Sequence, residues 1–154
     1  MARIDDEAFV RSCMALAAEA AEDGDPPFGA LLAGPDGLII ARARNRQVSS
    51  SDPTAHAEID LLRAAAANGH LPPLTGCRIV VNAEPCSMCA SAIVKAGISE
   101  LVFGAPHEPH MDPDLSVADV FARARHPPRV SGGVLATDAA AQIAAARLGA
   151  PPVD

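Results

Sequence analysis

The chain has no tryptophan and no tyrosine, and its 154 residues include only four phenylalanines. It holds 12 lysines and arginines against 19 aspartates and glutamates, for a formal net charge of −7. Proteins that bind nucleic acid need cations for the phosphates and often use aromatic rings for the bases. The composition therefore argues against a nucleic-acid partner and favours a small-molecule substrate.

Long apolar runs are also missing. No run approaches the roughly 20 residues of a membrane-spanning helix, and residues 1–7 lack the apolar core of a signal peptide. Four cysteines are too few for a disulfide scaffold in a chain of this length. We expect no membrane association, reduced thiols, a cytoplasmic location and a single domain over residues 1–154.

Two short motifs supply metal-binding chemistry: His56-Ala57-Glu58 and, further on, Pro85-Cys86-Ser87-Met88-Cys89. Zinc takes nitrogen and sulfur ligands in tetrahedral geometry, and a catalytic site keeps the fourth position for water, whose pKa falls to about 7. His56, Cys86 and Cys89 would fill the other three positions, so Zn²⁺ is the predicted cofactor. Glu58 lies two residues from a ligand and is the candidate general acid and base.

Two simpler interpretations of the cysteine pair remain. It would suit a redox dithiol, which leaves His56 and Glu58 unexplained, or half of a closed structural zinc site. A closed site needs a fourth ligand, and Cys77 is available, although it begins an apolar run typical of a core strand.

Periodicity and chain breakers predict ten alternating elements. Predicted helices cover residues 5–23, 52–68, 86–95, 115–125 and 137–148. Predicted strands cover residues 28–33, 38–44, 77–82, 98–104 and 129–135. This order predicts an α/β fold, a three-layer α/β/α sandwich around a five-stranded mixed sheet. It places His56 and Glu58 in the opening turns of one helix, and Cys86 and Cys89 at the start of another.

Arginines recur at Arg42, Arg44 and Arg46, which would share one face of a strand end. A solvated face balanced by nearby acids is the simpler interpretation, and a phosphate-contacting patch is the alternative.

The H-x-E and P-C-x-x-C motifs together are the signature of zinc-dependent nucleobase deaminases. With residues 27–30, 52–58 and 84–89, they make residues 5–148 resemble the cytidine/deoxycytidylate deaminase superfamily, especially its guanine deaminase-like and tRNA adenosine deaminase-like members. The resemblance implies a cytidine deaminase-like fold and a homodimer. It also implies substrate contacts from the Asn45 amide and the backbone near Ala30, Ala57 and Glu84. The Phe28 ring would either cover the base in the pocket or belong to the core.

The segments outside the motifs bear on the substrate. Phe28 resembles the guanine deaminases, and the acidic, proline-rich residues 106–114 suit phosphates poorly. Residues 126–130 and 133–135 look like the tRNA enzymes instead. Within the loop, His107 and His110 are candidate pocket residues, and the candidates for guanine recognition are Glu108, Asp112 and Asp114.

We therefore expect hydrolytic deamination of a free nucleobase or nucleoside, such as guanine, cytosine or an aminotriazine, with release of ammonia. The first alternative is a tRNA-specific adenosine deaminase that edits the wobble base from A to I. The second is a zinc-bearing homologue that has lost activity and serves as a partner subunit.

Overall fold

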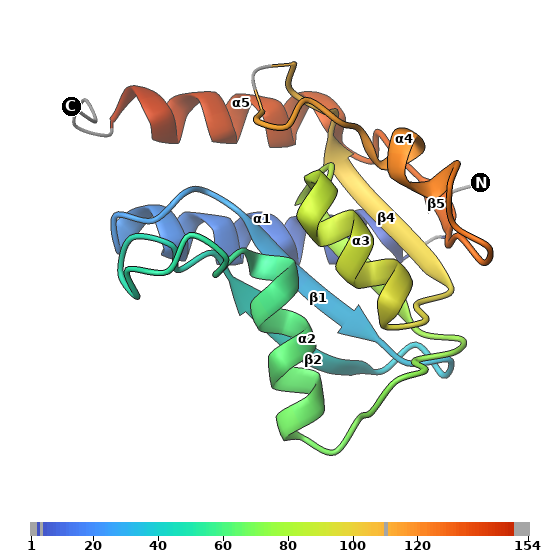
Figure 1. Ribbon diagram of the computed structural model, residues 1–154. Helices are drawn as coiled ribbons and strands as arrows, with labels where there is room; N and C mark the ends of the chain where they lie inside the picture. The colour runs from blue at the N-terminus through green and yellow to red at the C-terminus, as the bar shows by residue number, and fades with distance from the viewer. Residues whose placement is uncertain (1–2, 4, 110, 150–154) are drawn as a thin grey trace.

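A five-stranded mixed sheet forms the centre of the computed structural model, which describes residue 3, residues 5–109 and residues 111–149 (Figure 1). The strands are β1 (Gly29–Ala33), β2 (Ile39–Arg44), β3 (Arg78–Ala83), β4 (Glu100–Ala105) and β5 (Arg129–Ser131). Their order in the sheet is β2-β1-β3-β4-β5. β1 runs antiparallel to both β2 and β3, whereas β3, β4 and β5 are parallel.

Helices cover both faces of this sheet. They are α1 (Asp6–Glu22), α2 (Ala57–Ala67), α3 (Ser87–Lys95), α4 (Val117–Phe121) and α5 (Ala136–Leu148). α1 and α5 lie on one face, and α2, α3 and α4 lie on the other (Figure 1). The predicted three-layer α/β/α sandwich is therefore confirmed.

The apolar run of β3 explains its central place. Ile79, Val80 and Val81 are almost fully buried, and they alternate between the two cores. Strands covered on both faces read as continuous apolar sequence, because neither set of side chains meets water.

The segment that leads into β1 is fixed by two close contacts. A Cβ atom on Gly29 would lie 2.3 Å from the Cys13 carbonyl oxygen, so only glycine lets α1 pack this closely. The buried Asn82 side chain accepts a hydrogen bond from Gly29 N at 2.9 Å and donates one to Pro27 O at 3.0 Å. Phe28 is thus held between two anchored neighbours.

Two predicted helix boundaries are wrong. Asp52 does not cap a helix; its Oδ1 accepts hydrogen bonds from Thr54 N and Oγ1 at 2.8 and 2.7 Å, which makes a turn, and α2 begins only at Ala57. α4 is five residues long, since the Ser116 capping box starts it at Val117 and it ends at Phe121 instead of residue 125. A membrane-spanning helix is absent from the described part of the chain. The single domain over residues 1–154, the homodimer and the cytoplasmic location stay predictions.

Candidate active site

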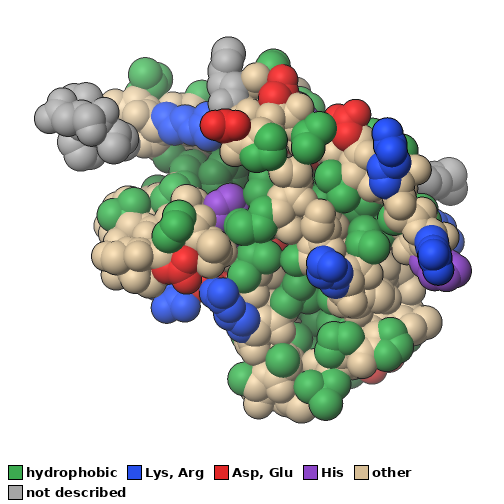
Figure 2. Space-filling view, in the orientation of Figure 1, with side chains coloured by type: hydrophobic (Ala, Val, Ile, Leu, Met, Phe, Trp, Pro, Cys, Tyr) green, Lys and Arg blue, Asp and Glu red, His purple; other side chains and the backbone are tan. Residues whose placement is uncertain are grey.

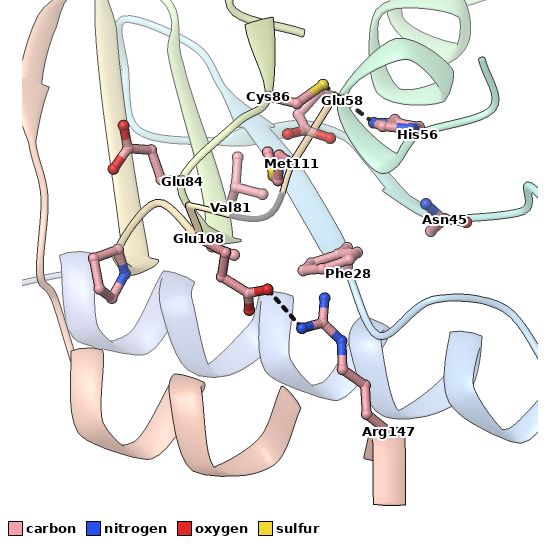
Figure 3. A pocket seen from close by; sticks show the side chains of 12 residues that line it. Phe28, Asn45, His56, Glu58, Val81, Glu84, Cys86, Glu108, Met111 and Arg147 are labelled. Atoms are coloured by element: carbon pink, nitrogen blue, oxygen red, sulfur yellow. Dashed lines mark hydrogen bonds and ion pairs between the residues drawn. The ribbon is translucent and has the colours of Figure 1, made fainter. Parts of the chain in front are cut away.

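Two helix starts bring the metal-binding side chains together. His56 is the N-cap of α2 and Cys86 is the N-cap of α3, with Cys89 in that helix's first turn. His56 Nδ1 lies 3.5 Å from Cys86 Sγ and 3.5 Å from Cys89 Sγ, and all three ligand atoms lie within 4.8 Å of one another. Figure 3 shows His56, Cys86 and Glu58 gathered at one end of a pocket.

This arrangement fits a zinc ion. Zinc–nitrogen bonds of about 2.0 Å and zinc–sulfur bonds of about 2.3 Å, at a tetrahedral angle, separate nitrogen and sulfur by about 3.5 Å. The observed separations match that value. Cys77 is not part of the group, so the described residues do not form a closed four-ligand site.

The two thiols of this group differ in acidity. Hydrogen bonding from Cys89, with a further contribution from His56, lowers the pKa of the Cys86 thiol to about 4. Hydrogen bonding with Cys86 and burial raise the pKa of Cys89. Because thiolates are the zinc ligands, zinc binding at this site releases the thiol protons.

Glu58 is a buried carboxyl beside the metal-binding group. It lies in the first turn of α2 and is 5% exposed. Burial raises its pKa, because the charged form loses its water shell. A carboxyl poised towards protonation in a pocket is suited to give and take protons during a reaction.

The pocket that contains these groups is bounded by twelve residues: Phe28, Asn45, His56, Glu58, Val81, Ala83, Glu84, Cys86, Pro106, Glu108, Met111 and Arg147. Six of the predicted site residues are among them. Ala30, Ala57 and Cys89 are not. Ala30 lies in central strand β1, paired with Ala43 and Val81, and Ala57 is fully buried.

Asn45 is held in a fixed orientation at the pocket wall. It is 1% exposed; its Oδ1 accepts from Gln47 N at 2.9 Å and its Nδ2 donates to Gln47 Oε1 at 2.7 Å. Its own N–H donates to Phe28 O at 2.9 Å. The two pocket residues are therefore joined through the backbone.

Asp25 anchors the loop that starts at Asn45 and leads to His56. It is 5% exposed, and its Oδ1 accepts from Val48 N and Ser49 N, each at 2.8 Å. Its Oδ2 accepts from Ser49 Oγ at 2.6 Å. The motif search gave no weight to Asp25, although an aspartate followed by two prolines is a strong turn signal.

Glu84 reaches the pocket rim, but its carboxylate is already engaged. Oε2 accepts from His107 N at 2.9 Å and Oε1 accepts from Val117 N at 3.0 Å. Glu84, which precedes Cys86 by two residues, therefore holds the segment after β4 in place.

The end of the pocket away from the metal-binding group was only partly predicted. Glu108, one of the candidate acids, lines it and pairs with Arg147, which sequence reasoning missed. Asp112 and Asp114 do not line it, and His107 turns aside to pair with Asp114 at 2.6 Å. His110 lies outside the described residues. The signal for Arg147 was its place in the last helical turn, where cations are common.

The predicted arginine face is not a continuous basic surface. Arg44 pairs with Glu19 of α1 and with Asp23, the residue after that helix, whereas Arg46 pairs with Asp60 of α2. Figure 2 shows Lys and Arg side chains scattered over the visible side of the molecule, with acidic side chains among them. The pairing supports the interpretation of a solvated, balanced face.

Solved structures with the same architecture include members of two functional groups. One, from a study of A-to-I editing by tRNA:A34 deaminases, has a TM-score of 0.80 and 35% identity, and the match covers 88% of this chain and 98% of that one. The other, a guanine deaminase from Nitrosomonas europaea, has a TM-score of 0.76 and 27% identity over 96% of this chain and 86% of that one.

The names of several curated relatives refer to tRNA. A tRNA(Ile)-lysidine synthase from Deinococcus deserti is 43% identical over 128 residues, which is 82% of this chain and 24% of the relative. A tRNA-specific adenosine deaminase from Haemophilus influenzae is 43% identical over 100 residues, 65% of this chain and 58% of the relative. The chain thus spans about a quarter of the first relative's length and somewhat over half of the second's.

These findings contradict two predictions. The free nucleobase or nucleoside substrate is wrong, because the relatives named for tRNA match at 43% identity and the guanine deaminase at 27%. The prediction that the protein has no nucleic-acid partner is wrong for the same reason. Composition misled here because it averages charge over the whole chain, whereas contact with a nucleotide depends on a few groups at the pocket.

The family itself is shown by the sequence. The model of the cytidine and deoxycytidylate deaminase zinc-binding region matches residues 3–105, which include both motifs. This confirms zinc as the cofactor and the predicted superfamily. The chain therefore belongs to the family of cytidine and deoxycytidylate deaminases that share this zinc-binding region.

Proposed function

We propose that this chain is a zinc-dependent hydrolytic deaminase that converts adenosine to inosine at the wobble position of a tRNA. The observation that carries the proposal is the buried Glu58 carboxyl beside His56, Cys86 and Cys89, in a pocket walled by Phe28. The named relatives and the A34-editing structure support the choice of substrate.

In this proposal His56, Cys86 and Cys89 hold the zinc. The chemistry that zinc supplies at such a site is Lewis-acid activation of water at neutral pH. Water gives its oxygen to the ring carbon that carries the amine. Its two protons go to the ring nitrogen and to the amine, which leaves as ammonia. Glu58 is the group that takes and delivers these protons.

The pocket walls orient the base for this exchange. Phe28 offers an aromatic face, and its neighbours are fixed by Asn82. The Asn45 oxygen accepts from Gln47 N and one N–H of its NH₂ group donates to Gln47 Oε1, which leaves the second N–H as a donor for a ring nitrogen. A flipped-out nucleotide is the form in which a base reaches such a pocket.

The test is inosine formation in a tRNA transcript that carries adenosine at position 34, measured by nucleoside chromatography. Glu58→Gln should retain zinc and lose activity by about 10²–10⁴-fold, the usual contribution of a general acid and base. A transcript with guanosine at position 34 is the control. Absence of inosine from every A34 transcript, with zinc bound, would contradict the proposal.

A further inference from the structure

An ion pair between Glu108 and Arg147 lies at the end of the pocket away from the metal-binding group (Figure 3). Arg147 Nη1 donates to Glu108 Oε2 at 2.6 Å. Arg147 comes from the last turn of α5, and Glu108 comes from the segment after β4. The proton transfers proposed for Glu58 make no use of either residue.

Arg147 is also placed by Phe28. Its guanidinium carbon lies 6.0 Å from the centroid of the Phe28 ring, within the range of a cation–π contact. Among the described residues that line the pocket, Arg147 is the sole Lys or Arg side chain. A polyanionic substrate that reaches this acidic chain therefore meets one cation at the pocket, already paired with a carboxylate.

We propose that Arg147 binds the phosphate of the nucleotide whose base enters the pocket, and that Glu108 occupies Arg147 until that phosphate replaces it. This inference rests on the proposed function, because the phosphate is that of the RNA chain. A base with its amine at the zinc end directs its sugar and phosphate to the opposite end, where Figure 3 shows Arg147 and Glu108.

The pair is built for exchange. The side chains of Arg147 and Glu108 are 51% and 40% exposed, so water already competes with their contact and it is weak. Only one of the five N–H donors of Arg147 is used within the described residues. A phosphate can take two donors at once, whereas Glu108 accepts only one from Arg147 here. Phe28 keeps the guanidinium in place during the exchange.

Glu108 then acts as a specificity-determining residue. A nucleoside carries no anionic group that can replace Glu108 on Arg147, so the ion pair stays intact and the nucleoside gains no contact with Arg147. A phosphorylated nucleotide gains the Arg147 contact and loses only the weak pair. The acidic residues 106–114, which argued against a nucleic-acid partner, would therefore favour substrates that carry a phosphate over those that do not.

The test measures RNA binding by fluorescence anisotropy with a labelled anticodon stem-loop, in zinc-loaded chains that carry Glu58→Gln to prevent turnover. In that background, Arg147→Gln should weaken binding about tenfold. It should also lower the slope of log affinity against log salt by about 0.7, the value for one phosphate contact with a single strand. Glu108→Gln should tighten binding by up to about fivefold.

Matched controls remove the same charges elsewhere. Arg123→Gln and Glu22→Gln change exposed residues outside the pocket that have no ion pair in the described part of the chain, and both should bind RNA as the parent does. Competition by AMP and by adenosine, which differ in one phosphate, tests whether the phosphate group itself is bound. AMP should compete better than adenosine with the parent and lose that advantage in Arg147→Gln.

Failure of this inference is distinct from failure of the proposed function. If the wild-type chain makes inosine in A34 transcripts but Arg147→Gln leaves the salt slope unchanged, only the phosphate site is wrong. Weaker binding in Glu108→Gln would overturn the competitor role of Glu108. If the wild-type chain makes no inosine and the stem-loop does not bind, both proposals fall.

Discussion

Replacing Asp25 with alanine should loosen the loop between Asn45 and His56 without touching the zinc ligands. The change removes the acceptor for two backbone N–H groups and one hydroxyl, all from Val48 and Ser49. A typical hydrogen bond contributes about 1 kcal/mol net, and bonds to a charged group contribute more. Because water reaches the exposed Val48 and Ser49, we expect a total loss of about 2–3 kcal/mol in the free energy of unfolding.

Asp25→Asn is the matched comparison. Its oxygen can keep both backbone N–H groups, and its NH₂ can donate to Ser49 Oγ in place of the bond that hydroxyl now gives. Only the charge is lost, so the expected cost is about 1 kcal/mol. Urea denaturation of the zinc-loaded variants measures both values. Zinc content should stay at the wild-type level, and KM for tRNA should rise with the loss of order at Asn45.

Two results would refute this reasoning. Unfolding of Asp25→Ala within about 0.5 kcal/mol of the wild type would show that the three bonds do not hold the loop. Equal damage in Asp25→Asn and Asp25→Ala would show that the negative charge, and not the acceptor geometry, is what the loop requires.

The remaining predictions concern pH and zinc. Burial raises the pKa of Asp25, but hydrogen bonds from Ser49 and Val48 outweigh it and leave the pKa below the ordinary 3.8. The wild type should therefore have a higher free energy of unfolding than Asp25→Asn, by the full difference above about pH 4. This difference should shrink as the pH falls through the lowered pKa of Asp25, and the acid-unfolding midpoints of the two proteins measure it. Cys89→Ser should weaken zinc binding at least tenfold in a chelator competition, since a thiolate is lost. Zinc removal from the wild type should lower its thermal midpoint, and an unchanged midpoint would contradict a role of zinc in folding stability.

The chemistry could be predicted from the sequence because its groups lie in short motifs. His56 and Glu58 are two residues apart, and Cys86 and Cys89 are three apart, so local helix geometry places each pair. The order of helices and strands along the chain also predicts the α/β/α sandwich, and the central position of β3 follows from its apolar run. Element boundaries were predicted less well, as at Asp52, which can form either a cap or a turn that local sequence does not distinguish.

The far end of the pocket could not be predicted in the same way. Glu108 and Arg147 are 39 residues apart and meet only because α5 packs on the sheet beside the segment after β4. Asn82 and Asp25 act through side-chain bonds to distant backbone groups, which leave no periodic pattern. The substrate prediction failed because it weighed the composition of the whole chain, whereas relatives named for tRNA match the chain at 43% identity.

The two bonds of Glu84 have a consequence for how such enzymes diversify. The carboxylate clamps His107 and Val117, the two ends of a surface segment, next to the helix that carries the cysteine ligands. Residues 108–116 can therefore gain, lose or exchange amino acids while their attachment points stay where they are. Substrate choice can change by loop replacement, with the metal chemistry left intact, and grafting this segment from a relative onto the Glu84 clamp is a direct route to new specificity.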